Sequence, residues 1–271
     1  MRLVLFLAVF MSASLCTLEA QEYLDKNWKR CPESKAKYVA EGIDSLPGSY
    51  IVRTKTAEGL SMNYSIYTTA DFRNGKMVSF SSKGDTLVVC GYVDGMIHGA
   101  YKQNLAGHGL YKKAQYQRGK EEGTTEYYFP NGQISARYQM KKGKVKSSEF
   151  WNSDGSVVKD ISTANYDAKL EHEGYPSFSK WVASMLEYPQ LCREKKIEGT
   201  VYCRFLITKE GKLVDVEILE SPHYLMTAQA IRILENSPVW KPAKRHNQII
   251  GVRHTFPVIF QLKAYGAGSH R

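Results

Sequence analysis

The sequence lacks the motifs that mark the common classes of enzyme. It has no Gly-x-Ser-x-Gly elbow, no His-Glu-x-x-His zinc helix and no Gly-x-x-x-x-Gly-Lys phosphate loop. Its seven histidines are scattered, and no two have the spacing of a metal-binding pair on one helix face. We therefore expect a protein that is not an enzyme and that uses no metal or cofactor.

Long apolar runs are also missing. The longest, Leu3 to Phe10, is far shorter than the roughly 20 residues that cross a bilayer. An arginine precedes this run and an alanine ends the segment, so residues 1–20 are predicted to be a secretory signal peptide. Cys16 raises the alternative of a lipoprotein, but Leu15 before it is bulkier than the small residue usual there. We expect an exported, soluble, periplasmic chain.

Cysteine is sparse, and four residues remain once Cys16 is removed with the signal peptide. An even number in an exported protein permits two disulfides, although four cysteines allow three pairings. The predicted domain boundaries favour bridges between Cys192 and Cys203 and between Cys31 and Cys90. Alternatively, the cysteines are buried free thiols. For Cys31 and Cys90 this alternative is as well supported as a bridge, whereas for Cys192 and Cys203 it is less favoured.

Clustered basic charge is scarce although the net charge is +10. The densest basic runs, at residues 141–146 and 241–245, are short, and acidic residues are interspersed throughout. Nucleic-acid binding would require Lys and Arg clustered on one element with aromatic residues between them. We therefore expect no nucleic-acid partner, while weak attraction to an anionic envelope surface stays open.

The middle of the chain, residues 70–160, repeats itself with a fixed period. Tyr-x-x-Gly segments end at Gly95 and Gly119, and a weaker copy ends at Gly143, so the glycines lie 24 residues apart. Asn131-Gly132 and Asp154-Gly155 are strong hairpin-turn pairs, because both central turn residues need positive φ. The segment resembles MORN-type repeats, including an antitoxin-like bacterial family. The resemblance implies stacked β-hairpins that bury their apolar faces against one another.

This interpretation divides the N-terminal part of the chain. Residues 21–69 would lead into the sheet, and the polar residues 161–176 would form a linker. The tyrosine-rich repeat could offer an extended recognition surface, or its tyrosines could simply pack a thin sheet.

The last third alternates between strand and helix patterns. Apolar and polar residues alternate on both sides of Gly211, which predicts a β-hairpin with one buried face. Apolar residues then recur at helical spacing after Ser221, which we expect to cap that helix. The predicted elements are a helix over 178–186, strands over 201–207 and 213–219, a helix over 224–236 and a strand over 252–262. The fold class is α+β: a repeat antiparallel sheet followed by a small α-β-β-α-β domain.

Several separated motifs in this part strongly resemble the C-terminal domain of TonB proteins. The motif residues are Tyr188, Pro189, Gly199, Gly211, Trp240 and Pro242. The resemblance covers about residues 171–263, with the domain itself at 177–263 and a tail at 264–271. It implies a periplasmic protein of a Gram-negative bacterium that engages an outer-membrane transporter or another envelope protein. TonB proteins also have a membrane anchor and a long proline-rich spacer, whereas this chain has only nine scattered prolines.

The resemblance also implies a docking place. In TonB proteins the last strand receives a short transporter peptide. The matching positions here are Arg253, His254, Thr255, Phe256, Val258 and Phe260. Pro257 has no N–H to donate, which fits an edge strand. Alternatively, the repeat domain or a second copy covers this edge. A different function also stays open, in which the protein is an envelope scaffold and its repeat sheet binds polymer or lipid.

Overall fold

The computed structural model describes residues 21–43, 48–56, 59–69, 72–170 and 174–262. The predicted signal peptide with Cys16 and the predicted tail at 264–271 lie outside these ranges. Within them, no helix has both the length and the apolar character needed to cross a membrane. The chain divides into two compact units, one ending at Val158 and the other beginning at Lys159.

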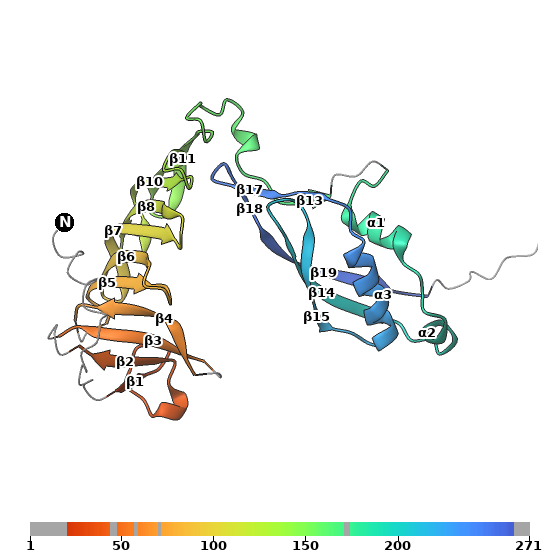
Figure 1. Cartoon of the computed structure of the whole chain (residues 1–271), viewed down its shortest axis with the longest axis horizontal. Helices are drawn as coiled ribbons and strands as arrows, with labels where there is room; N and C mark the ends of the chain where they lie inside the picture. Colours follow the sequence, from red (N-terminus) through yellow and green to blue (C-terminus); the bar gives the residue numbers. More distant parts are fainter. Residues whose placement is uncertain (1–20, 44–47, 57–58, 70–71, 171–173, 263–271) are drawn as a thin grey trace, which may run out of the picture. The chain divides into compact units, whose positions relative to one another are not determined.

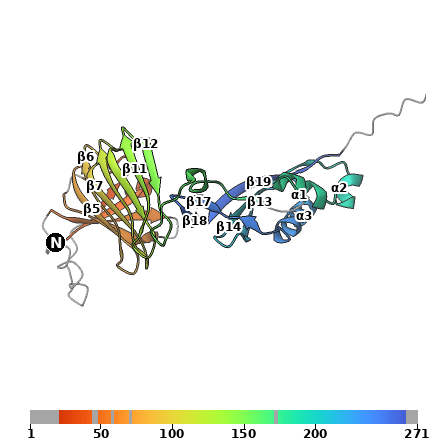
Figure 2. The same cartoon turned by 90° about the horizontal axis from the view of Figure 1, so that it is seen from above.

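The N-terminal unit is a twelve-stranded antiparallel sheet in which strands follow one another in chain order, except that the short β9 pairs only with β8, which also pairs with β10 (Figure 1). The sheet twists along its length (Figure 2), as β-sheets of L-residues do. A short 3-10 helix, Glu33–Lys35, joins the first two strands. The strands are β1 (Glu22–Leu24), β2 (Tyr38–Gly42), β3 (Tyr50–Thr56), β4 (Gly59–Tyr67), β5 (Gly75–Phe80), β6 (Thr86–Val93), β7 (Met96–Leu105), β8 (Gly109–Gln117), β9 (Lys120–Glu121), β10 (Gly123–Tyr128), β11 (Ile134–Lys141) and β12 (Lys144–Phe150).

The 24-residue period corresponds to a repeated turn. At each repeat a non-glycine residue and the following glycine both have positive φ, as a two-residue hairpin turn requires. Each of these glycines donates its N–H to a carbonyl oxygen 22 residues earlier. The three bonds run from Gly95 to Arg73 (2.7 Å), from Gly119 to Ile97 (2.8 Å) and from Gly143 to Glu121 (2.9 Å). Each turn is thereby tied to the turn region of the preceding repeat.

The N-terminal sheet is larger than the sequence predicts. Antiparallel strands begin at Glu22 rather than near residue 70, so the described part of 21–69 contributes the four strands β1 to β4 to the sheet instead of only leading into it. Strand β2 pairs with β3 along its whole length, from Tyr38 opposite Thr54 to Gly42 opposite Tyr50. The predicted antiparallel strands are present, whereas their assignment to MORN-type repeats stays a prediction.

The C-terminal unit packs two helices against one face of a three-stranded sheet with the order β15-β14-β19. Two short two-stranded sheets accompany it: β13 pairs with β16, which lies far away in sequence, and β17 pairs with β18 as a hairpin. Its elements are η2 (Ile161–Thr163), β13 (Lys169–Leu170), α1 (Phe178–Met185), α2 (Gln190–Glu194), β14 (Gly199–Ile207), β15 (Leu213–Glu220), α3 (Tyr224–Glu235), β16 (Trp240–Lys241), β17 (Ala243–Arg245), β18 (Gln248–Ile250) and β19 (Val252–Phe260).

The core of this unit lies between the helices and the sheet. Helix α3 packs against β14 and β15 through residues at helical spacing, including Met226, Ala230 and Ile233. Phe178 of α1 lies 5.9 Å from Phe205 of β14, measured between ring centroids. The elements α1, β14, β15, α3 and β19 lie where the sequence predicts helices and strands. Helix α2 and the three short strands β16, β17 and β18 lie between them, and β13 precedes α1.

Two local predictions are wrong. Helix α3 is capped by His223 rather than Ser221, because the His223 Nδ1 atom accepts the Leu225 N–H at 3.2 Å. The predicted linker over 161–176 is largely part of the fold, since β13 pairs with β16. Ala164 is fully buried there, and its carbonyl oxygen accepts the Asn247 N–H at 3.0 Å.

Candidate functional site: the outer edge of the last strand

Strand β19 forms one edge of the C-terminal sheet. It pairs with β14 over its full nine-residue length, from Val252 opposite Ile207 to Phe260 opposite Gly199, without a shift of register. In the described part of the chain, no strand pairs with its other side. An unpaired edge of this length presents a row of N–H and C=O groups to another chain.

The direction of these backbone groups follows from the hydrogen bonds around β14. Beyond the end of β14, Thr208 donates its N–H to Lys212 on the β15 side (2.8 Å), so the even-numbered residues of β14 bond toward β15. Its odd-numbered residues then bond to β19, because backbone groups alternate sides along a strand. Pro257 lies opposite the even-numbered Tyr202, where no ladder bond is made. The groups of β19 that face outward are those of Arg253, Thr255, Pro257 and Ile259.

The opposite edge, β15, is less regular. Its register with β14 shifts twice, and Asp215 within it has a φ of 53°, in the left-handed region. Such a bulge breaks the row of backbone groups and is a common means of blunting an exposed edge. β19 is therefore the better template for an added strand.

The structure separates the six predicted docking residues into two groups. The side chains of Arg253 and Thr255 are exposed, and their backbone groups face the open edge. Val258 and Phe260 are buried in the core, and their backbone groups face β14. The prediction that these two contact a partner is therefore wrong, because strand alternation turns both their side chains and their backbone inward.

His254 and Phe256 also face the core and are half-buried. The Phe256 ring lies 4.8 Å from Phe178. The His254 ring lies 6.0 Å from Phe205 and 5.8 Å from Trp240, and its buried Nε2 atom has no hydrogen-bond partner. These two residues stabilise the strand from behind rather than offering contacts to a partner.

Ile259 belongs to the site although the sequence analysis omitted it. Its side chain is 58 % exposed, and its backbone groups face outward. It lies on the open face of the sheet near Tyr202, also exposed, which is opposite Pro257. Strand alternation alone predicts this orientation, because a residue between the inward-facing Val258 and Phe260 must point to the other face of the sheet.

Charged residues occupy the other end of this open face. Arg253 lies 3.6 Å from Asp215, and Arg204 lies 3.2 Å from Glu217. All four side chains are about half exposed, so these ion pairs contribute little to stability. The edge thus has an arginine near its beginning and an apolar patch near its end.

The motif residues at the start of the domain support β19 from within the unit. The Tyr188 hydroxyl donates to the Ile197 carbonyl oxygen (2.6 Å), and its ring packs edge-on against Phe260 at 5.8 Å. Pro189 precedes α2 and accepts the Arg193 N–H at 3.0 Å. These contacts hold the segment before β14 against the end of β19.

The remaining motif residues fix the hairpin. Gly211 has a φ of 79°, and a Cβ atom there would overlap the Trp240 carbonyl oxygen, so only glycine fits. The Trp240 N–H donates to Gly211 (2.8 Å), and the indole is buried. Gly199 is the first residue of β14, and a Cβ atom there would press against the Pro222 side chain. Pro242 lies between β16 and β17.

All four cysteines of the described ranges are free thiols, so neither predicted disulfide is present. The Cys192 Sγ atom lies 3.4 Å from His223 Nδ1, on the side of α3. The Cys203 Sγ atom instead lies 3.8 Å from the Val201 carbonyl oxygen, and burial raises the pKa of this thiol to about 11. Each of the two thiols thus has its own contacts inside the core.

Comparison with known proteins shows a similarity in this unit. Residues 184–262 match the family model of the Gram-negative bacterial TonB protein C-terminal domain. The match lies wholly within the C-terminal unit and ends just after β19. The structural unit begins earlier, because α1 and β13 contribute to the same core. No curated protein matches the chain.

Proposed function

We propose that the C-terminal unit binds an outer-membrane transporter, or another protein of the Gram-negative envelope, by accepting a strand on the outer edge of β19. The observation that carries this proposal is the nine-residue edge, which has a continuous register and no strand on its outer side among the described residues. The match to the TonB C-terminal family model supports the choice of partner class and an exported, periplasmic location. Peptide recognition by strand addition needs only such an edge.

The backbone would supply most of the affinity. The outward N–H groups of Arg253, Thr255 and Ile259 are donors, and Pro257 adds a further carbonyl acceptor. Each hydrogen bond contributes about 0.5–1.5 kcal/mol net. On the added strand, the exposed side chain of Arg253 would favour an acidic residue opposite the beginning of β19, and that of Ile259 would favour an apolar residue opposite its end.

The test is capture of outer-membrane proteins from envelope extract by the purified protein. Thr255→Pro removes one outward donor without removing a bond to β14, so we expect at least tenfold weaker capture with a nearly unchanged melting temperature. Thr255→Val keeps the N–H and the strand preference, and it should bind like the original protein.

Two results would contradict the proposal. Equal capture by Thr255→Pro and Thr255→Val would place the docking site elsewhere on the molecule. A stable dimer in sedimentation that Thr255→Pro dissociates would show that a second copy occupies the edge instead of an envelope partner.

A further inference from the structure

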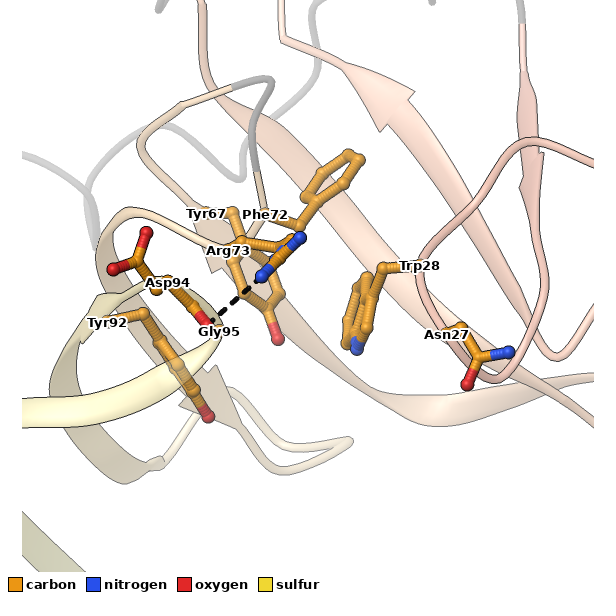
Figure 3. Close-up of a pocket in the computed structure, with 8 residues that line it drawn as sticks. All are labelled: Asn27, Trp28, Tyr67, Phe72, Arg73, Tyr92, Asp94 and Gly95. Atoms are coloured by element: carbon orange, nitrogen blue, oxygen red, sulfur yellow. Dashed lines mark hydrogen bonds between the residues drawn. The ribbon is translucent and has the colours of Figure 1, made fainter. Parts of the chain in front are cut away.

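The N-terminal unit contains a pocket of about 290 Å³ that is independent of the β19 edge (Figure 3). The pocket lies between the turn after β1, the end of β4 and the turn between β6 and β7. This volume is at the lower end of the range for small-molecule sites. The residues that line it are Asn27, Trp28, Tyr67, Phe72, Arg73, Tyr92, Asp94 and Gly95.

Aromatic rings form the floor of the pocket. Figure 3 shows the rings of Tyr92, Tyr67 and Trp28 side by side. The Tyr67 ring centroid lies 6.4 Å from that of Tyr92 and 5.3 Å from that of Trp28. Phe72 packs against Tyr67 edge-on at 5.5 Å. Tyr67 and Phe72 are buried by this packing, so the rings that the pocket exposes are mainly those of the half-buried Trp28 and Tyr92.

Trp28 is held in place by an unusual backbone conformation. Its φ is 64°, in the left-handed region that bulky residues rarely adopt. The Asp25 carboxylate maintains this turn by accepting the N–H groups of Asn27 (2.7 Å) and Lys29 (3.0 Å). The indole also stacks on Tyr38, with 4.4 Å between ring centroids. Conformations of this kind are concentrated at binding sites, where they set a side chain in advance.

The rim of the pocket is polar and carries no net charge. Asn27, Arg73 and Asp94 supply one amide, one guanidinium and one carboxylate, and all three residues are exposed. Figure 3 shows the Arg73 guanidinium directed toward the Asp94 carbonyl oxygen, to which Nη2 donates at 3.3 Å. Planar amide, guanidinium and carboxylate groups can each bond two neighbouring hydroxyls at once.

These features select among ligand classes. A cation in an aromatic cage would be repelled by Arg73, and a phosphate would be repelled by Asp94. A lipid chain would displace water from these rim groups without offering them a hydrogen bond in return, which is unfavourable. A sugar ring combines an apolar C–H face, which suits the aromatic floor, with hydroxyls at its edge, which suit the rim. We propose that this pocket binds a neutral saccharide.

The test is saturation-transfer NMR on the purified protein with glucose, galactose, mannose and N-acetylglucosamine as probes. We expect transfer to at least one sugar, and the Trp28 indole N–H signal, assigned with Trp28→Phe, should shift during the titration. Asn27→Ala should weaken the binding at least fivefold without changing the melting temperature, because Asn27 is exposed. Lys26→Ala changes an exposed residue of the same turn that does not line the pocket, and it should leave binding unchanged.

Other outcomes would overturn the proposal. Absence of saturation transfer to all four sugars would exclude a neutral saccharide site. A shift of the Trp28 signal by choline, or by inorganic phosphate, with none by sugars would assign the pocket to cations or anions instead. Sugar binding that Asn27→Ala and Lys26→Ala reduce equally would place the sugar outside this pocket.

Discussion

The two units of this protein are stabilised in different ways. Of the twelve largest fully buried side chains among the described residues, ten belong to the C-terminal unit although it is the shorter one. The N-terminal unit contributes only Leu24 and Thr125 to that group. Instead, its sheet has rows of aromatic rings, such as Tyr127, Tyr138 and Phe150 at successive centroid distances of 5.9 and 5.7 Å.

The N-terminal sheet also contains a cluster of hydrogen-bonded polar side chains around Lys112 and Glu121, both of which are largely shielded from water. The Lys112 ammonium lies 2.6 Å from a Glu121 carboxylate oxygen and 5.4 Å from the centre of the Tyr127 ring. Tyr116 and Thr125 donate to the same carboxylate at 2.9 and 2.8 Å. The repeated hairpins are therefore stabilised mainly by contacts with the neighbouring strands, whereas the C-terminal unit depends on contacts between residues that are far apart in its sequence.

Removing a buried ring from the C-terminal core should cause the largest loss of stability. Phe205→Ala should cost about 3–5 kcal/mol, because Phe205 is fully buried between Phe178, Trp240 and His254. Tyr138→Ala in the N-terminal sheet should cost about 2 kcal/mol, since it is only partly buried and loses two edge-on ring contacts. In calorimetry, Phe205→Ala should lower the unfolding temperature of the C-terminal unit, and Tyr138→Ala should lower that of the N-terminal unit. Equal effects of the two changes would refute the difference in core depth.

A second, smaller effect concerns the polar cluster. Lys112→Met should cost about 2 kcal/mol, because the partly buried Glu121 carboxylate loses its charged hydrogen-bond donor. Adding Glu121→Leu should recover most of this loss, since the uncompensated charge is then removed as well. Urea denaturation of the two variants measures both values. A double variant no more stable than Lys112→Met would show that the cluster does not act as a pair.

Acid should affect the N-terminal unit first. Burial alone would raise the pKa of Glu121, but the hydrogen bonds from Lys112 and Thr125 outweigh it and hold the pKa below its ordinary value of 4.5. The contribution of Glu121 to the free energy of unfolding is fully present above pH 4.5, and it is lost as the pH falls through the lower pKa of the folded state. In the C-terminal unit, the carboxyls with lowered pKa, Asp160 and Glu210, are fully exposed. Thermal melts from pH 6 to pH 3 should show the N-terminal transition falling more steeply, and a steeper fall of the other transition would contradict this.

The smallest expected effect tests the cap of α3. His223→Ala should cost about 1 kcal/mol in the C-terminal unit, because the Leu225 N–H loses its acceptor. His223→Ser replaces the ring with a good capping residue and should restore most of that stability. Both values come from denaturant melts. A loss in His223→Ser as large as in His223→Ala would point to the contact with Cys192 rather than to the cap.

Local patterns made much of the C-terminal unit predictable. Alternation identified β14 and β15, and Pro257 indicated an edge strand before any pairing was known. The cap of α3 was misplaced because Ser221 is a common capping residue and lies only two positions before His223. The docking residues were taken from the family resemblance without regard to strand alternation, so the inward orientation of Val258 and Phe260 was overlooked.

Contacts between distant residues could not be predicted in the same way. The segment at 161–170 is polar and resembles a linker, but it is held by partners about 80 residues later, including the Arg245 Nη1 bond to the Tyr166 carbonyl oxygen at 2.8 Å. The aromatic pocket likewise combines the turn at Trp28 with residues of β4 and β6. No periodic pattern links such segments, because their proximity depends on the complete sheet.

Residue-resolved amide hydrogen exchange reports directly whether a partner adds a strand to the β19 edge. In the free protein the amides of Arg253, Thr255 and Ile259 should exchange quickly, because they face outward, while those of His254, Phe256 and Val258 should be protected by β14. Adding an outer-membrane protein captured from envelope extract should slow exchange at Arg253, Thr255 and Ile259. Bound protein in which these three amides still exchange as fast as in the free state would contradict strand addition at this edge.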